Sequence, residues 1–582
     1  MRLRTLLTPI SILILFLLPG ALLTASANGR EPKRAPGGDI FTKTDSWVEE
    51  TLARMTVSEK VGQMIVASVD AQYKSNSDRD YMMLSRLASE GKIGGIMFLK
   101  GDVISAGMFA NHLQSVSTVP LLVSADMERG LAMRLDGATA FSPAMAIAAT
   151  GNPDLATDMT KVIASEARAV GIHQNYAPTV DLNINPANPV INTRSFGDRI
   201  PLVISMSSAI IEGLQSNGIV ATAKHFPGHG DVTVDSHLAL PVLQADRQRL
   251  DDYELKPFRA AIAQGVMSVM VGHLAVPKLT GSLEPASLSR TIVTDLLRQE
   301  LGFKGLIVTD ALNMKALNNG RSPQEICIKA VEAGNDLLLF PVDPELAHNA
   351  VTAAVESGRI PVKSIDDSVR RILMVKHWLG LDRKKLVDLS RLQDHVGSEE
   401  GSLIAEKIAE RALTLIRDRE SYLPLHTPLN GPVVDIILND KPGEDLGNRF
   451  AEMLGMDYAV IHVRLDPSSR ENAFQAADEM TKSASAVILT TGIQAYSRSV
   501  PSKLSSRQIE FVRSLPVRVP RGTPVVFISF GTPYILNAFP EIGTALCAYS
   551  ENEYSEQSVI RVLKGDLVPK GTLPVSLEGS AP

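Results

Sequence analysis

The densest group of residues able to do chemistry lies between positions 224 and 237. It begins with the string Lys224-His225-Phe226-Pro227-Gly228-His229-Gly230-Asp231 and ends with Asp235-Ser236-His237. The proline and the two glycines exclude a regular helix, so the sequence predicts a shaped loop. Asp235 and His237 are two positions apart and leave an extended segment on the same side. A carboxylate bonded to one ring nitrogen fixes the tautomer and raises the basicity of the other, so the pair predicts a proton-transfer dyad.

Two other interpretations of this loop are a metal site and an ordinary solvated loop. Histidine and aspartate are suitable metal ligands, but their spacing here matches no zinc motif and the chain has no H-E-x-x-H sequence. The only cysteines are Cys327 and Cys547, which excludes a disulfide framework and a cysteine-based metal cluster. No glycine-rich phosphate loop follows a predicted strand. We therefore expect neither a metal nor a cofactor.

A series of apolar runs supplies the strands that would position this loop. Eight runs occur, at residues 63–67, 93–99, 120–125, 177–182, 220–224, 268–271, 306–309 and 336–340. Amphipathic helical patterns fill several gaps, such as 153–170 and 246–264, and Thr56 with Glu59 has the spacing of a capping box. Strands and helices in alternation over about 300 residues predict an α/β fold, a (β/α)8 TIM barrel. A doubly wound open sheet is the structural alternative.

Polar residues cluster at the C-terminal ends of these runs. Asp126 follows the third run, Lys224 and His225 the fifth, His273 the sixth and Asp310 the seventh. In a barrel those ends share one face, where active sites lie. The pattern therefore predicts an active site built from several strands.

A second series of apolar runs begins at residue 433 and predicts a C-terminal α/β sandwich domain with a mostly parallel sheet. The runs are 433–438, 458–463, 486–489, 524–530 and 545–548, and a helix is expected from about 402 to 416. We predict a barrel domain over residues 45–395, a connecting helix and linker over 396–432, and the C-terminal domain over 433–582.

The first 44 residues are predicted to be a targeting segment and a linker. Arg2 and Arg4 precede an apolar stretch that is densest at 12–18, and Ala25-Ser26-Ala27 follows. This order is typical of a secretory signal peptide over residues 1–27, with an uncleaved anchor as the alternative. Residues 28–44 are polar with proline and glycine and predict a linker. We expect an exported protein, periplasmic or extracellular, without a stable membrane span after cleavage.

Composition narrows the function classes. The chain has 582 residues, of which 45% are hydrophobic and 21% charged, and its formal net charge is −6. This balance is ordinary for a packed protein. It argues against a nucleic-acid binder that relies on a general basic surface.

The 224–237 segment resembles the signature of the β-N-acetylglucosaminidase branch of glycoside hydrolase family 3. The long ordered string makes the resemblance specific, and it covers most of the chain from about residue 46 onward. Further matching stretches lie at residues 47–49, 55–56, 59–64, 124–128, 133–135, 177–183, 194–197, 306–314 and 571–575.

The resemblance implies a role for each site residue. Asp310 would be the nucleophile that forms a covalent glycosyl intermediate, and His237 the acid and base, oriented by Asp235. Sugar recognition would fall to charged residues able to form strong hydrogen bonds, namely Asp126, Arg134, Arg194, Lys224 and His225. His229 and Asp231 are expected to shape their own loop.

One departure from the family pattern concerns Arg129. The family usually has a glycine pair after the glutamate of the third-strand loop, whereas this chain has Glu128-Arg129-Gly130. A bulky cation at this position is expected to intrude near the sugar site, which leaves the finer substrate preference open.

The resemblance implies a secreted, retaining β-N-acetylglucosaminidase that acts on peptidoglycan fragments or related GlcNAc-terminated glycans. The alternatives are another family 3 activity, such as a β-glucosidase, and a non-catalytic glycan-binding relative. β-Glucosidases of the family typically take their acid/base carboxylate from the second domain and lack the Asp-Ser-His element, which is present here. Because a neutral histidine repels an incoming anion less than a carboxylate would, phosphate or azide could serve as acceptor alongside water.

Overall fold

The computed structural model describes residues 35–75, 77–318, 320–426, 429–443, 446–493 and 504–577. The predicted signal peptide lies outside the described residues. Of the predicted linker, residues 35–44 are described, and Ala35 is buried with its N–H donating to the carbonyl of Gln264 (2.8 Å). Over the described part of the chain, no helix has the length and apolar character needed to cross a bilayer.

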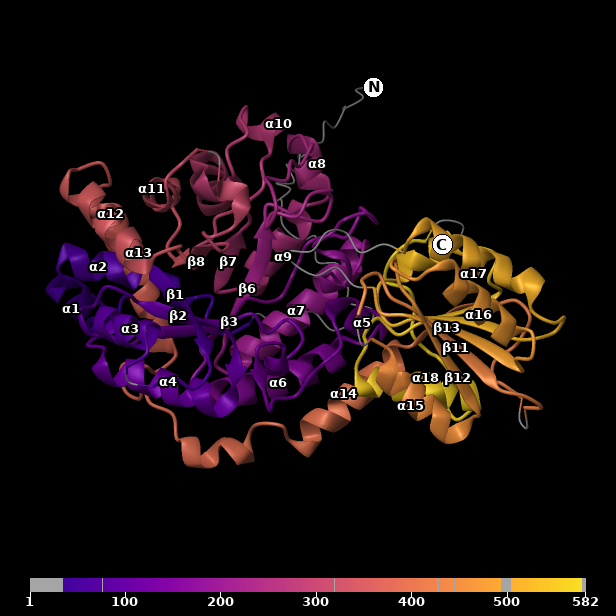
Figure 1. Cartoon of the computed structure of the whole chain (residues 1–582). Helices are drawn as coiled ribbons and strands as arrows, with labels where there is room; N and C mark the ends of the chain where they lie inside the picture. The colour runs from indigo at the N-terminus through magenta and orange to yellow at the C-terminus, as the bar shows by residue number, and fades with distance from the viewer. Residues whose placement is uncertain are drawn as a thin grey trace, which may run out of the picture.

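The first part of the chain forms a nearly closed barrel of parallel strands (Figure 1). Its strands are β1 (Ile65–Ala71), β2 (Gly95–Asp102), β3 (Leu122–Ala125), β5 (Gln174–Asn175), β6 (Val220–Phe226), β7 (Ser268–Val271), β8 (Leu306–Thr309) and β9 (Leu338–Leu339). Hydrogen-bonded neighbours follow the order β8-β7-β6-β5-β3-β2-β1-β9, and the short β4 (Leu135–Asp136) pairs with β2. A bridge between Val308 and Leu337 brings β8 next to β9. The barrel prediction is confirmed.

The predicted fourth strand is wrong. The strand is β5, only two residues long, and residues 177–182 form a loop in which Thr179 makes a single bridge to Lys224. The pattern misled because Gln174 is polar yet fully buried, and its amide donates to Thr222 Oγ1 (3.1 Å) and Ser268 Oγ (3.2 Å) inside the barrel. The apolar 177–182 run is buried as loop wall instead.

Helices surround the barrel. They are α1 (Ser46–Arg54), α2 (Val57–Gln63), α3 (Arg79–Ser89), α4 (Val103–Val116), α5 (Ala144–Ala149), α6 (Pro153–Ala169), α7 (Ile200–Ser216), α8 (Arg247–Asp252), α9 (Leu255–Gln264), α10 (Pro277–Thr280), a π-helix (Thr291–Glu300), α11 (Pro323–Ala333), α12 (Pro344–Glu356) and α13 (Val362–Trp378). The capping box at Thr56 and Glu59 is confirmed. The helix expected over 246–264 is interrupted at residues 253–254, where the Glu254 carboxylate turns inward and accepts from Arg249 Nε (3.2 Å).

The second part of the chain is a three-layer α/β sandwich, as predicted. Its sheet has the order β10-β15-β14-β13-β11-β12, antiparallel only at β10–β15. The strands are β10 (Thr414–Asp418), β11 (Val433–Leu438), β12 (Val460–Leu465), β13 (Ala486–Thr491), β14 (Val525–Ser529) and β15 (Thr544–Cys547). Residues of α16 (Glu471–Thr481) and α17 (Ser506–Arg518) pack on one face, and those of α15 (Asn448–Asp457) and α18 (Glu553–Lys564) on the other.

The connecting helix begins and ends a few residues earlier than expected. α14 (Glu399–Ala412) ends before the apolar residues that prolonged the helical pattern, and those residues begin the edge strand β10. β10 thus lies within the predicted linker and joins the second sheet. The domain boundaries themselves stay predictions.

The last described residues return to the barrel. The N–H of Thr572 donates to the carbonyl of Ala149 (2.9 Å), and the N–H of Ser576 donates to Asp198 Oδ2 (2.8 Å). Arg199 Nη2 donates to the carbonyl of Leu573 (2.9 Å). Residues 572–576, here called the terminal strap, therefore hold the chain just after Arg194.

Candidate active site

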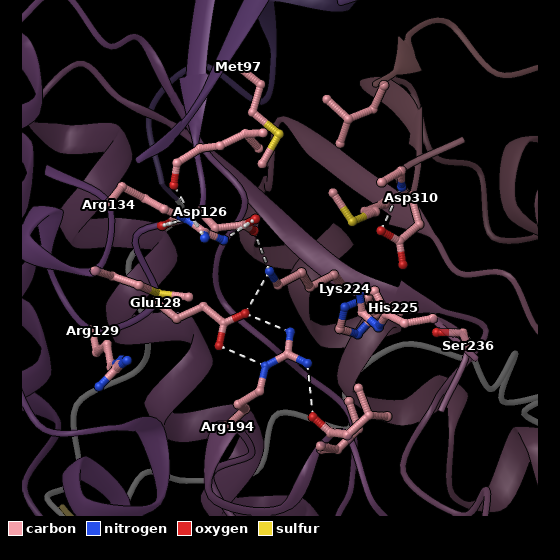
Figure 2. Close-up of a pocket in the computed structure, with 18 of the residues that line it drawn as sticks. Met97, Asp126, Glu128, Arg129, Arg134, Arg194, Lys224, His225, Ser236 and Asp310 are labelled. Atoms are coloured by element: carbon pink, nitrogen blue, oxygen red, sulfur yellow. Dashed lines mark hydrogen bonds and ion pairs between the residues drawn. The ribbon is translucent and has the colours of Figure 1, made fainter. Parts of the chain in front are cut away.

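A cavity of about 660 Å³ opens among the loops at the C-terminal ends of the barrel strands (Figure 2). All of the residues that line it lie between positions 70 and 340. Its polar wall includes Asp126, Glu128, Arg129, Arg134, Arg194, Lys224, His225, His229, Ser236, His237 and Asp310. The structure thus brings every predicted site residue except Asp235 to the wall of one cavity.

One wall of the cavity is a network of two carboxylates and three cations. Asp126 accepts from Lys224 Nζ (2.8 Å) and Arg134 Nη2 (2.8 Å). Glu128 accepts from Lys224 Nζ (2.7 Å) and, at both oxygens, from Arg194 Nη2 (2.7 Å) and Nε (3.0 Å). Such charge-assisted bonds hold the side chains in one geometry. Figure 2 shows this network on the side of the pocket opposite Asp310.

The network keeps its charges despite burial. Burial opposes ionisation, but Lys224 with Arg134 holds the pKa of Asp126 below its ordinary value, and Arg194 with Lys224 holds the pKa of Glu128 well below its own. Burial would lower the pKa of Lys224, whose side chain is 2% exposed, but the two carboxylates raise it. Glu128, which the sequence reasoning did not assign to the site, therefore holds Arg194 and Lys224 in place, and Asp126 links Lys224 to Arg134.

A second buried carboxylate, Asp181, orders the loop that follows β6. It accepts from the backbone N–H groups of His225 (3.1 Å) and His229 (2.7 Å) and from Nδ1 of His225 (2.7 Å). Burial opposes its ionisation, but His225 holds the pKa of Asp181 below its ordinary value. The sequence reasoning missed this residue, although an aspartate inside the apolar 177–182 run was a signal.

The remaining residues of this loop act mainly on its shape. His229 is buried, its Nε2 lies 3.3 Å from Ser236 Oγ, and burial with the nearby His225 lowers the pKa of His229 to about 4. His229 is therefore neutral near pH 7, although it also lines the cavity. Asp231 forms an ion pair with Arg249 away from the cavity.

Asp310 directly follows β8. Its N–H continues the sheet by donating to the carbonyl of Val271 (2.9 Å), and its Oδ1 accepts from the N–H of Ala311 (2.7 Å). Burial opposes its ionisation, but the surrounding histidines, His273 first, and the Ala311 N–H place the pKa of Asp310 below its ordinary value. Burial also lowers the pKa of His273, so this histidine is neutral near pH 7. The hydrogen bond from the Ala311 N–H stabilises the ionised Asp310 whatever the charge of the histidines.

His237 and Asp235 form the predicted dyad. The Nδ1 of His237 lies 2.7 Å from Asp235 Oδ1, which also accepts the His237 N–H (2.8 Å). Asp235 is buried behind the ring, whereas the His237 side chain is 19% exposed and lines the cavity. With Nδ1–H donating to the carboxylate, Nε2 is the nitrogen left for proton exchange. The N–H of Ala316 donates to the carbonyl of Ser236 (3.2 Å), which ties this loop to the segment after Asp310.

The donor set of the cavity suits acid–base and nucleophilic chemistry. Within the described ranges, no three histidine, cysteine, aspartate or glutamate side chains gather in a way that could hold a metal ion. An ionised carboxylate and a carboxylate-bound imidazole line the same pocket, beside a wall of charged hydrogen-bonding groups. This arrangement provides the groups that an enzyme needs to displace a leaving group, namely a carboxylate nucleophile and an acid/base, beside a wall that suits a polar substrate.

Comparison with known proteins identifies the family. The family described as "Glycosyl hydrolase family 3 N terminal domain" matches residues 56–375, more than half of the chain. The chain therefore belongs to glycoside hydrolase family 3.

Several relatives and solved structures match nearly the whole chain. It is 30% identical over 551 residues to the "Beta-N-acetylglucosaminidase/beta-glucosidase" of Cellulomonas fimi, covering 91% of this chain and 95% of the relative. It resembles the structure of a family 3 β-N-acetylglucosaminidase from Paenibacillus sp. str. FPU-7, with a TM-score of 0.79, 32% identity and coverage of 90% and 99% of the two chains. It also resembles the β-glucoside phosphorylase BglX, with a TM-score of 0.82, 25% identity and coverage of 92% and 96%.

Proposed function

We propose that this protein is a retaining, exo-acting β-N-acetylglucosaminidase that removes terminal GlcNAc from glycans. The observation that carries the proposal is the Asp235–His237 dyad, which supplies an acid/base from the barrel itself to the cavity that holds Asp310. The names of the Cellulomonas and Paenibacillus proteins support the choice of sugar.

The proposed reaction has two displacements. In the first, an Asp310 oxygen attacks the anomeric carbon while Nε2–H of His237 protonates the leaving oxygen, which gives a glycosyl ester of Asp310 and a neutral imidazole. In the second, the same nitrogen takes a proton from water as the water oxygen attacks the anomeric carbon and releases Asp310. Two inversions retain the β configuration.

The shape of the site suits a terminal sugar. With its anomeric carbon at Asp310, a ring presents its far hydroxyls to the network around Glu128. The network groups are already held in place by one another, so binding a sugar there fixes few side chains that were free before. A chain continuing beyond that wall would have to displace the network, which favours exo action.

β-Glucosidase or another family 3 β-glycosidase activity is the second candidate. The Cellulomonas relative carries both activities in its name, and BglX is named for β-glucosides. We also propose peptidoglycan fragments as the natural substrate class and an exported location. The exported location rests on the residue pattern of the first 27 positions. The substrate class rests on the proposed specificity for terminal GlcNAc.

Turnover of aryl β-GlcNAc against aryl β-glucoside tests the proposal. We expect aryl β-GlcNAc to be hydrolysed faster than the glucoside, without added metal and at a rate that a chelator does not change. NMR should detect the β-anomer of free GlcNAc as the first product. Asp310→Asn, which keeps the shape of the side chain, is the matched inactive control. A clear preference for the glucoside would pass the assignment to the second candidate, and loss of activity on chelation would contradict the metal-free mechanism.

A further inference from the structure

Arg129 is the one residue in the cavity wall whose positive charge has no protein partner among the residues that the structure describes. It lines the cavity and is exposed, and its guanidinium makes no hydrogen bond or ion pair within the described ranges. The other guanidinium and ammonium groups of the wall are paired. Arg134, Arg194 and Lys224 bind the network carboxylates, and Lys100 lies 3.6 Å from Asp70.

The network carboxylates do not need Arg129. Both oxygens of Asp126 and both oxygens of Glu128 already accept from Lys224, Arg134 or Arg194. The network therefore holds two negative and three positive charges before Arg129 adds a fourth cation. A surplus guanidinium beside a substrate pocket is available to an anionic ligand, because its planar donors match carboxylate, sulfate and phosphate oxygens.

The backbone fixes the place of this side chain. The carbonyl of Arg129 accepts from the N–H of Phe141 (3.0 Å). The next residue, Gly130, has φ +92°, and a Cβ there would lie 2.5 Å from the carbonyl oxygen of Thr139. The loop thus holds Arg129 beside Glu128, on the side of the pocket opposite Asp310 (Figure 2).

This position decides which part of a substrate Arg129 meets. Under the proposed function the anomeric carbon lies at Asp310, so the leaving group and the acceptor stay near His237. The opposite wall then faces the C3, C4 and C6 edge of the terminal sugar. We propose that Arg129 is a specificity-determining residue that binds an anionic substituent, a sulfate, phosphate or carboxylate, on that edge of the terminal sugar. This inference rests on the proposed function for the orientation of the ring.

The test compares charged and neutral substrates within each variant. The probes are 4-nitrophenyl β-GlcNAc, its 6-O-sulfate and its 3-O-lactyl ether, so that the two charged arms separate C6 from O3. In wild type we expect kcat/KM for one charged probe to exceed that of the neutral probe by roughly tenfold, as one exposed charge-assisted contact gives. The ratio should fall to about one in Arg129→Gln, recover in part in Arg129→Lys, and decrease with added salt in wild type.

Lys100→Gln is the matched control, because it removes another cation of the same cavity wall that already has an acidic partner. The charged-to-neutral ratio should stay at its wild-type value in Lys100→Gln. A wild-type ratio of one or less for both charged probes, or the same ratio in Arg129→Gln as in wild type, overturns the inference. Failure of the proposed function would appear separately, as poor turnover of the neutral probe relative to its glucoside analogue.

Discussion

Asp181→Asn is the most informative single change, because Asp181 is buried outside the cavity wall and holds two residues of that wall, His225 and His229. Its two oxygens accept from three donors, the backbone N–H groups of His225 and His229 and the Nδ1–H of His225. An amide oxygen replaces only one of these oxygens, and the amide N–H₂ then faces a donor. The conflict is relieved if His225 carries its proton on Nε2, so the variant should invert the tautomer of a predicted sugar-binding ring.

The size of the effect follows from these contacts. A hydrogen bond to an ionised acceptor contributes about 1.5–3 kcal/mol and a neutral one about 0.5–1.5 kcal/mol. Three bonds that each lose about 1 kcal/mol should lower the free energy of unfolding by about 3 kcal/mol. Because the pKa of Asp181 is lowered in the folded state, this stabilisation is fully present above the ordinary aspartate pKa and is lost as pH falls through the folded value.

Urea unfolding at pH 7 and steady-state kinetics on aryl β-GlcNAc measure the two effects. We expect kcat/KM to fall roughly ten- to a hundredfold, as the loss of one substrate hydrogen bond predicts. Asp231→Asn is the control, because Asp231 belongs to the same loop but pairs with Arg249 near the surface, and its effect on unfolding should stay below about 1 kcal/mol. Wild-type stability and kcat/KM in Asp181→Asn would refute the positioning role.

Four further predictions concern three reacting groups and one buried lysine. Asp310→Ala should lower kcat by about 10³-fold or more while far-UV circular dichroism stays unchanged, and a fluorosugar should label wild type at Asp310 rather than at another carboxylate. His237→Ala should be about 10²- to 10⁴-fold slower than wild type on substrates with poor leaving groups. Added azide should restore turnover of aryl β-GlcNAc by this variant and yield a β-glycosyl azide. Wild-type rates in His237→Ala would show that His237 is not the acid. Asp235→Asn should be milder than His237→Ala. Burial lowers the pKa of Lys376 to about 7, so between pH 7 and 10.5 the unfolded state binds more protons than the folded state. The free energy of unfolding should therefore rise across that window by up to about 5 kcal/mol. An equal rise in Lys376→Met would contradict this prediction.

The site residues that sequence could predict are those fixed by local order. The spacing within the 224–237 string was enough to predict the Asp235–His237 pair. The position of Asp310 directly after an apolar run was enough to predict a carboxylate at the C-terminal end of a strand. The barrel was predictable for the same reason, because seven of the eight mainly apolar runs overlap its strands, and parallel strands buried on both faces are rich in apolar residues.

The residues that sequence missed depend on contacts between distant positions. Gln174 reads as polar, and only Thr222 and Ser268, far along the chain, explain its burial in β5. Glu128 gains its place from Arg194 and Lys224, and Asp181 from the loop after β6. A hydropathy pattern contains no record of such partners, so it assigned the fourth strand to the wrong residues.

The terminal strap gives the active site a dependence on the order of synthesis. Asp198 and Arg199, just after the predicted sugar-binding residue Arg194, make hydrogen bonds to residues 573–576. Ser576 follows Arg199 by 377 positions, which take about 20–75 s to translate at about 5–20 residues per second. The barrel strands can therefore associate long before the Arg194 loop receives its outer support. A chain cut after residue 571 should keep its far-UV circular dichroism but show a raised KM. A nonsense mutation at codon 572 would then act as a defect in substrate binding rather than in folding. An unchanged KM in the cut chain would show that the strap is dispensable.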